Sequence, residues 1–278
     1  MSVLDNVIKE ASQVRTIYLD NPYIKKLDMG STSKGNQPKY YDYSTNEYIK
    51  EQFYYQDIYW KDYMVEVLSS VIAKELHTSI QIVHQTVAEL SNGRFACISK
   101  DFSKDDYDWV PMSRTKCYEQ CKKERGKSFK IFTAIKDYFG NIGLDITEYL
   151  VVMIIMDFLL GNEDRHYGNF GFLKNKDGSV SVAPLFDFGL GLFEHDINYR
   201  AINLYTAKLK MDGKPFDIDL QNPVDMLFNS GYGSLVYSIF KDITIPNKEL
   251  FPNDLGYQYF INSYSYLKER MKEYEICW

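Results

Sequence analysis

The spacing of hydrophobic residues predicts several helices. Over residues 58–76 apolar side chains recur every three or four positions and line one side of a helix: Met64, Val67, Leu68, Val71 and Ile72. A second predicted helix, 146–160, is apolar on all sides from Tyr149 onward and contains Asp157. It is too short to cross a bilayer, so we expect a buried core helix. Three more helices are predicted at 2–13, 129–139 and about 254–274.

Strand-like segments, several of them rich in aromatic residues, occupy much of the first hundred residues. They are predicted at 14–19, 40–43, 47–53, 80–87 and 94–98. Residues 101–127 are polar and broken, which is typical of a linker. After the linker the pattern is mainly helical, with a short hairpin at 169–173 and 180–186. We therefore expect an α+β protein with a small mixed lobe over 1–102 and a mostly helical lobe over 103–278.

Composition excludes several classes of protein. The chain has 278 residues, 45 % hydrophobic and 25 % charged, which excludes a disordered or fibrous chain. The net charge is -6, whereas dedicated nucleic-acid-binding proteins are basic, so no direct binding to nucleic acid is expected. Four cysteines do not form a disulfide framework in a chain of this length. The spacing of Cys117 and Cys121 can place both on one helix face, but no metal site is expected there. With no signal peptide or membrane span visible, we expect a cytoplasmic protein with no membrane partner.

The residues that carry chemistry follow the buried helix. Asp164 stands five residues before Asn169, and Asp187 begins the triplet Asp-Phe-Gly eighteen residues later. Protein kinases use the same separation and the same triplet. Carboxylate and amide oxygens suit Mg²⁺, so Asn169 and Asp187 are the candidate metal ligands. Asp164 is the candidate group that orients or deprotonates an acceptor hydroxyl.

The segment Asn162-x-Asp164-Arg165-His166-x-x-Asn169-Phe170 resembles the catalytic loop of the HipA-like kinases. These are bacterial serine/threonine kinases related in fold to the phosphoinositide kinases, and their Asp-Arg-His triplet reverses the order of ordinary protein kinases. The resemblance extends over roughly residues 28–195. It implies a two-lobed, protein-kinase-like fold that transfers the γ-phosphate of ATP, with Mg²⁺, to a serine or threonine of a protein.

The same resemblance implies a set of site residues. Asp164 and His166 are the catalytic candidates. The nucleotide is expected to contact the loop at 31–39, the following strands and helix, the segment between the lobes and the catalytic loop, through Ser33, Lys34, Gly35, Asn36, Gln37, Lys39, Lys50, Glu66, Lys100, Phe102, His166, Asn169 and Phe186. Members of the family phosphorylate a serine in the corresponding loop, which makes Ser31, Thr32 and Ser33 candidates for a self-inhibiting modification.

Each of these residues also has an ordinary structural interpretation. Lys50 and Lys39 are either phosphate ligands or solvated strand lysines, and Glu66 is either near the nucleotide or an exposed helix glutamate. His166 contacts ATP or orients Asp164, and the two roles are compatible. The identities of Lys100 and Phe102 say little, because a segment between lobes acts through its backbone. The basic run over 122–130 is either a solvated face or a docking site for an acidic substrate or RNA.

The sequence departs from the toxin-type members of the family. Only about 29 residues precede the nucleotide loop, so we expect a compact form without their extra N-terminal subdomain. The sequence therefore does not decide whether a regulatory partner protein of the antitoxin kind exists, and it does not name the protein substrate. No Ala-Pro-Glu follows Asp187, so no conventional activation segment is expected. The alternatives to a protein kinase are a small-molecule or lipid-head-group kinase, and a nucleotide-binding regulator without turnover.

Overall fold

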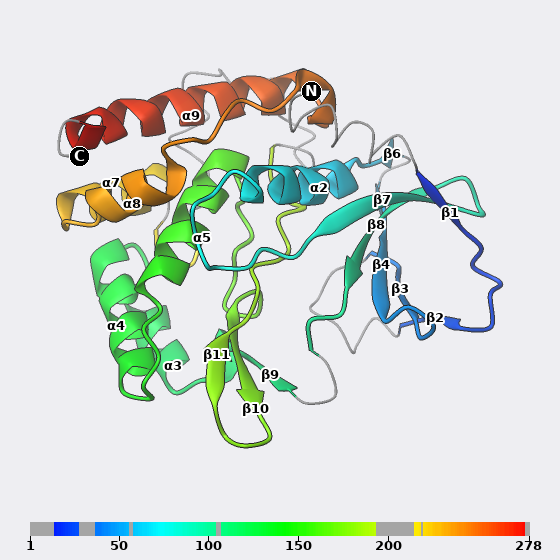
Figure 1. The fold of residues 1–278 in the computed structure, drawn as a ribbon, viewed down its shortest axis with the longest axis horizontal. Coiled ribbons are helices and arrows are strands. Elements are labelled where there is room, and N and C mark those ends of the chain that lie inside the picture. The colour runs from blue at the N-terminus through cyan, green and yellow to red at the C-terminus, as the bar shows by residue number, and fades with distance from the viewer. Residues whose placement is uncertain are drawn as a thin grey trace.

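A computed structural model describes residues 14–27, 37–55, 58–103, 107–192, 214–217 and 219–275. The chain forms a curled sheet on one side and a group of helices on the other, with helix α2 between them (Figure 1). This is the expected mixed α+β architecture with a helical C-terminal part. Among the described residues, no helix combines the length and the apolarity needed to span a membrane.

The sheet of the N-terminal lobe has six strands in the order β1-β7-β8-β4-β3-β2. Only β1 and β7 run parallel, and the other neighbours are antiparallel. Its buried side chains form a small hydrophobic cluster of their own, which includes Ile49, Leu90 and Ile98. The six strands are β1 (Arg15–Ile17), β2 (Ile24–Lys26), β3 (Lys39–Asp42), β4 (Glu47–Glu51), β7 (Gln85–Leu90) and β8 (Phe95–Lys100).

Helix α2 (Asp62–Ala73) connects the two hydrophobic clusters. It packs against β7 and β8, but its buried residues Val65, Leu68 and Ile72 belong to the larger cluster of the helical lobe. A small two-stranded sheet, β5 (Tyr54–Tyr55) with β6 (Ile58–Tyr59), precedes it. The predicted helix over 58–76 is therefore confirmed in its core, while its first residues belong to a strand.

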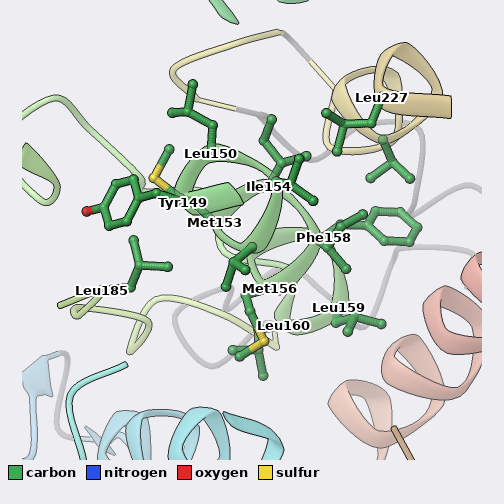
Figure 2. Packing of buried hydrophobic residues seen from close by; sticks show 14 of the residues in the cluster. Tyr149, Leu150, Met153, Ile154, Met156, Phe158, Leu159, Leu160, Leu185 and Leu227 are labelled. Carbon is green, nitrogen blue, oxygen red and sulfur yellow. The ribbon is translucent and has the colours of Figure 1, made fainter. Parts of the chain in front are cut away.

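Helix α5 (Thr147–Leu160) is the centre of the helical lobe. Every side chain from Tyr149 to Leu160 is buried, and these side chains extend in all directions from the helix axis (Figure 2). This all-round burial explains why its sequence lacks an amphipathic stripe. The surrounding helices are α3 (Cys117–Lys123), α4 (Ser128–Gly140), α7 (Gln221–Asn229), α8 (Gly233–Phe240) and α9 (Asp254–Glu275).

A second sheet, β11-β10-β9, lies below α5 and beside α3 in the view of Figure 1. It consists of β9 (Tyr107–Pro111), β10 (Gly171–Asn175) and β11 (Val180–Val182). Strand β10 passes so close to β9 that a Cβ atom on Gly171 would lie 2.2 Å from the carbonyl oxygen of Val110. Glycine is therefore required at the point where the chain leaves the loop that follows α5.

Several predicted elements differ from the structure. The stretch 101–127 is not a linker, because it contains β9 and α3, and Cys117 and Cys121 occupy the buried face of α3 with their Sγ atoms 3.4 Å apart. The predicted strand at 80–87 begins at Gln85 instead. Before it, Ile82 forms a bridge to Leu185 and thereby joins the two lobes. The predicted helix at 2–13 lies outside the described residues.

Candidate active site

A cavity of about 830 Å³ lies between the sheet and the helical lobe. The N-terminal lobe contributes residues of β3, β4, β8 and α2 to its wall, and the helical lobe contributes the loop after α5 and the segment after β11. Nine of the predicted site residues, from both lobes, line it: Lys39, Lys50, Glu66, Lys100, Phe102, Asp164, His166, Phe186 and Asp187. The cavity is large enough for a nucleotide-sized ligand.

Lys50 is the centre of a charge network in this cavity. Its Nζ atom donates to Glu66 Oε1 and to Asp187 Oδ1, each at 2.9 Å. Burial disfavours the charged lysine, but the carboxylates of Asp187 and Glu66 outweigh it and raise the pKa of Lys50 well above its ordinary value. Glu66 also accepts a hydrogen bond from the backbone N–H of Phe188 at 3.1 Å, which ties α2 to the Asp-Phe-Gly segment. Because both side chains take part in this network, Lys50 is not a solvated strand lysine and Glu66 is not an exposed helix glutamate.

Asp187 is held in an unusual backbone conformation. Its φ angle is 63°, in the left-handed region that costs a residue with a side chain of order 1–3 kcal/mol. Burial disfavours the charged carboxylate, but Lys50, with help from Lys39, lowers the pKa of Asp187 far below its ordinary value. The carboxylate is therefore ionised at any physiological pH. A Cβ atom on the following Gly189 would crowd Glu66 Oε1 at 3.1 Å, so the turn is closely fitted to the network.

Lys39 adds a second cation. It lies directly opposite Lys50 in the β3–β4 ladder, so both side chains share the face of the sheet that looks into the cavity. Burial, and next the charge of Lys50, lower the pKa of Lys39 below its ordinary value. Two lysines held this close gain from an anion between them, which is what a polyphosphate provides.

The loop after α5 is anchored by a buried ion pair. Gly161 ends the helix with φ 59°, and the chain turns back so that Arg165 meets Asp157 of the helix. The Nε atom of Arg165 lies 3.0 Å from Asp157 Oδ2 and its NH2 lies 2.9 Å from Oδ1. Asn162 donates a further hydrogen bond to Asp157 at 2.8 Å. The side chain of Arg165 is fully buried, so this pair is a structural anchor and not a solvated contact.

Arg165 also connects the two chemical segments. Its NH1 donates to the carbonyl oxygens of Asn169 and Phe186, and its guanidinium lies 4.5 Å from the ring centre of Phe188. Burial opposes its charge, but Asp157 outweighs this and raises the pKa of Arg165. One buried cation thus positions the backbone of both Asn169 and Phe186, the residue before Asp187. Sequence reasoning included Arg165 in the motif but missed this role.

Asp164 and His166 of this loop line the cavity, whereas Asn169 is buried and is not among the lining residues. The Asp164 carboxylate is half-exposed at the cavity, 3.8 Å from Lys214 Nζ. The ring of His166 accepts a hydrogen bond from the Gly168 N–H through Nδ1 at 3.0 Å, which fixes the ring beside the cavity. Asn169 donates through Nδ2 to the Asp164 carbonyl at 3.3 Å, while its Oδ1 is buried and has no hydrogen-bond partner among the described residues. A buried amide oxygen without a partner suits a metal ligand.

The donor set fits Mg²⁺ bound with a nucleotide. Within the described ranges no group of three or more His, Cys, Asp or Glu side chains is arranged to hold a metal by itself. Mg²⁺ in nucleotide sites usually takes one or two protein oxygens and completes its shell with phosphates and water. Asn169 Oδ1 and the Asp187 carboxylate supply that number, so the predicted ligands suit the ion.

Three aromatic rings line the side of the cavity near the segment between the lobes. Phe102 lies 5.4 Å from Phe186 and 6.0 Å from Trp109, and Trp109 lies 5.7 Å from Phe186. All three belong to the cavity wall. Such a cluster offers apolar faces to a planar base. Phe102 and Phe186 were predicted site residues, whereas Trp109 was missed because its strand was taken for a linker.

Other predicted residues lie elsewhere. Ser33, Lys34, Gly35 and Asn36, and the proposed modification sites at 31–33, lie outside the described residues. Gln37 donates from its side chain to Asp62 at the start of α2 and does not line the cavity. Lys100 touches the cavity rim, but its ammonium pairs with Glu47 at 3.0 Å on the outside of the sheet. Only its backbone position therefore serves the site.

Comparison with known proteins addresses the fold directly. No family model matches the chain. Over 116 residues the sequence is 27 % identical to the serine/threonine-protein kinase CtkA of Helicobacter pylori. The matched residues make up 40 % of this chain and 35 %, about a third, of that protein. The crystal structure of the Helicobacter pylori proinflammatory kinase CtkA matches the fold with a TM-score of 0.60 at 18 % identity, over 92 % of this chain and 93 % of that one. The chain has a kinase-like fold. The expected fold class is thereby confirmed.

Within this kinase-like fold the cavity occupies the space between the lobes. Lys50 from the sheet, Glu66 from α2 and Asp187 from the Asp-Phe-Gly segment meet there, as in an assembled kinase site. Asp157, which pairs with Arg165, and Trp109, which lines the cavity, are the residues of the candidate site that the sequence analysis did not assign. For Asp157 a signal was present, because a charge inside an otherwise apolar helix requires a buried partner.

Proposed function

We propose that this chain is an ATP-dependent serine/threonine protein kinase of the HipA-like type. The observation that carries the proposal is the network in which Lys50 bridges Glu66 and Asp187 at 2.9 Å, in the same cavity as the Asp164 carboxylate. Degenerate kinases commonly lack one of these groups. In this proposal residues 1–102 form the nucleotide lobe and 103–278 the catalytic lobe.

The chain's own residues divide the work as follows. The rings of Phe102, Trp109 and Phe186 receive the adenine, and the ammonium groups of Lys39 and Lys50 bind the phosphates. Asn169 and Asp187 hold Mg²⁺, which when bound supplies positive charge against the phosphates.

Asp164 performs the step at the acceptor. Its carboxylate accepts the hydrogen bond of a serine or threonine hydroxyl and takes the proton as the oxygen attacks the γ-phosphorus. The phosphoryl group leaves ADP and joins the acceptor oxygen. Arg165 holds the backbone carbonyls of Asn169 and of Phe186, the residue before Asp187, in place throughout.

The choice of a protein as acceptor rests on the similarity to a protein named as a serine/threonine kinase. Small-molecule and lipid acceptors are tested as alternatives in the same experiment. The purified chain is incubated with γ-labelled ATP and Mg²⁺, alone, with a bacterial lysate and with lipid vesicles. Label in protein bands supports the proposal, whereas label only in lipid or small molecules contradicts it.

Two variants and a control separate catalysis from binding. Asp164→Asn should lose at least about a hundredfold in transfer while it keeps ATP affinity, since Asp164 acts on the acceptor. Asp187→Ala should lose the Mg²⁺-dependent part of ATP binding in titration calorimetry. Asp137→Asn, at an exposed position of α4, is the control and should change neither. Normal turnover by Asp164→Asn would remove Asp164 from the mechanism.

A further inference from the structure

The surface around α3 has a charge opposite to that of the rest of the molecule. Residues 114–130 contain seven lysines or arginines and two glutamates, a net charge of +5, while the whole chain carries -6. All seven cationic side chains are exposed. Glu124 pairs with Lys127 at 2.9 Å and with Lys130 at 3.7 Å, so the uncompensated charge lies at the earlier positions.

This charge begins in the wall of the active-site cavity. Arg114 and Tyr118 line the cavity together with Asp164. Arg114 is exposed and makes neither a hydrogen bond nor an ion pair with any other described residue. An arginine at such a position is available to a ligand, and its planar guanidinium is suited to carboxylates.

Packed side chains extend the charge outward along α3. The ring of Tyr118 packs edge-on against Tyr167 of the catalytic loop, with centroids 5.1 Å apart. Lys122, one helical turn further, holds its Nζ 5.2 Å from the centre of the Tyr118 ring. The four cations that we call the α3 basic patch are therefore continuous with the site where Asp164 meets the acceptor: Arg114, Lys116, Lys122 and Lys123.

We propose that the α3 basic patch binds aspartate or glutamate residues that flank the acceptor hydroxyl in the protein substrate. This inference rests on the proposed kinase activity and names its substrate class. One turn of α3 separates Tyr118 from Lys122, about 6 Å along the helix axis. An extended peptide advances about 3.3 Å per residue. Acidic residues within about four positions of the acceptor therefore reach the patch.

An acidic peptide fits the charge distribution better than RNA does. The chain outside residues 114–130 carries a net charge of -11. A long polyanion that follows the patch must cross this acidic surface and is repelled there, whereas a short acidic segment ends within the patch. The patch also lies against the catalytic loop, where a substrate must dock and a nucleic acid has no role in the transfer.

The experiment compares two synthetic peptides with one serine each. One carries aspartates at the second to fourth positions on both sides of the serine, and the other carries asparagines there. We expect kcat/KM for the aspartate peptide to be about tenfold higher, with the ratio falling as salt is raised. The double variant Lys122→Glu with Lys123→Glu should reduce the ratio to about one while the KM for ATP stays unchanged. Lys174→Glu, on the exposed side of β10, is the matched control and should keep the tenfold ratio.

Each result decides the matter. Equal kcat/KM for the two peptides, or an unchanged ratio in the double variant, overturns the inference and leaves the kinase proposal intact. Peptide binding is measured in parallel by fluorescence anisotropy. If neither peptide is phosphorylated and the lysate assay also labels no protein, but the aspartate peptide binds and the double variant does not bind it, the kinase proposal fails and the docking surface stands. If a labelled single-stranded RNA binds more tightly than the aspartate peptide and the double variant loses it, the patch is a nucleic-acid site and the inference is wrong.

Discussion

Removing the carboxylate of Asp157 tests whether the buried ion pair holds the active site together. In Asp157→Ala, Arg165 loses the contacts at 2.9, 3.0 and 3.3 Å and keeps only its hydrogen bonds to two carbonyl oxygens. Because the guanidinium is fully buried, water cannot replace the lost acceptor. Breaking such a pair costs about 3–5 kcal/mol. We therefore expect a melting temperature lower by about 10 °C and a loss of phosphoryl transfer.

A second variant separates the charge from the anchor. In Asp157→Leu with Arg165→Met no unpaired charge remains, so most of the stability should return. Transfer should stay absent, because nothing ties the backbone of Asn169 to that of Phe186. Melting is followed by circular dichroism, and transfer with labelled ATP. A melting temperature of Asp157→Ala within 2 °C of the parent, or activity that returns with stability in the double variant, would refute the reasoning.

Three further substitutions have defined outcomes. Gly171→Ala should destabilise the protein by several kcal/mol, because its Cβ would lie 2.2 Å from a carbonyl oxygen, whereas Gly140→Ala meets no atom within 4 Å and should be neutral or slightly stabilising in the same melting assay. Burial raises the pKa of Asp62 to about 6, so the folded state binds its proton more tightly than the unfolded chain does and loses up to about 3 kcal/mol as the pH rises from 4 through 6. In Asp62→Asn the free energy of unfolding, measured by urea denaturation at each pH, should no longer fall over this pH range. An unchanged fall would show that other groups cause it. Trp109→Ala should weaken ATP binding about tenfold in calorimetry, whereas Phe129→Ala, with an exposed ring, should not; equal affinities would exclude Trp109 from the base site.

Local patterns predicted well the elements that have a clear period and a nearby turn, and they missed elements that lack a local partner or are too short to show a period. The helices α4 and α5 and the β3–β4 pair are close to their predicted bounds, because each has a clear period and a nearby turn. Strand β9 was missed, since it pairs with β10 some sixty residues away and has no local partner that fixes its conformation. Helix α3 has seven residues, too few to establish a periodic stripe.

The candidate site was predictable where a motif carries its chemistry. Asp164, Asn169 and Asp187 follow from spacing, and the cavity brings Lys50 and Glu66 to the same place. The sequence does not show that Lys100 turns outward, since its direction depends on Glu47 across the sheet. Nor does it show what Arg165 contacts, because three of its partners are backbone or ring atoms brought together by tertiary folding.

The position of α2 in the core of the helical lobe limits how this molecule can be controlled. Val65, Leu68 and Ile72 are almost completely buried there, and each is worth about 1.5–3 kcal/mol relative to exposure. A regulator that displaced α2, and with it Glu66, would need roughly 5–9 kcal/mol of differential affinity, which is comparable with the stability of a whole domain. The pair of Lys50 and Glu66 is therefore assembled by folding itself. Control by small ligands or single modifications must act on entry to the cavity and not on this helix.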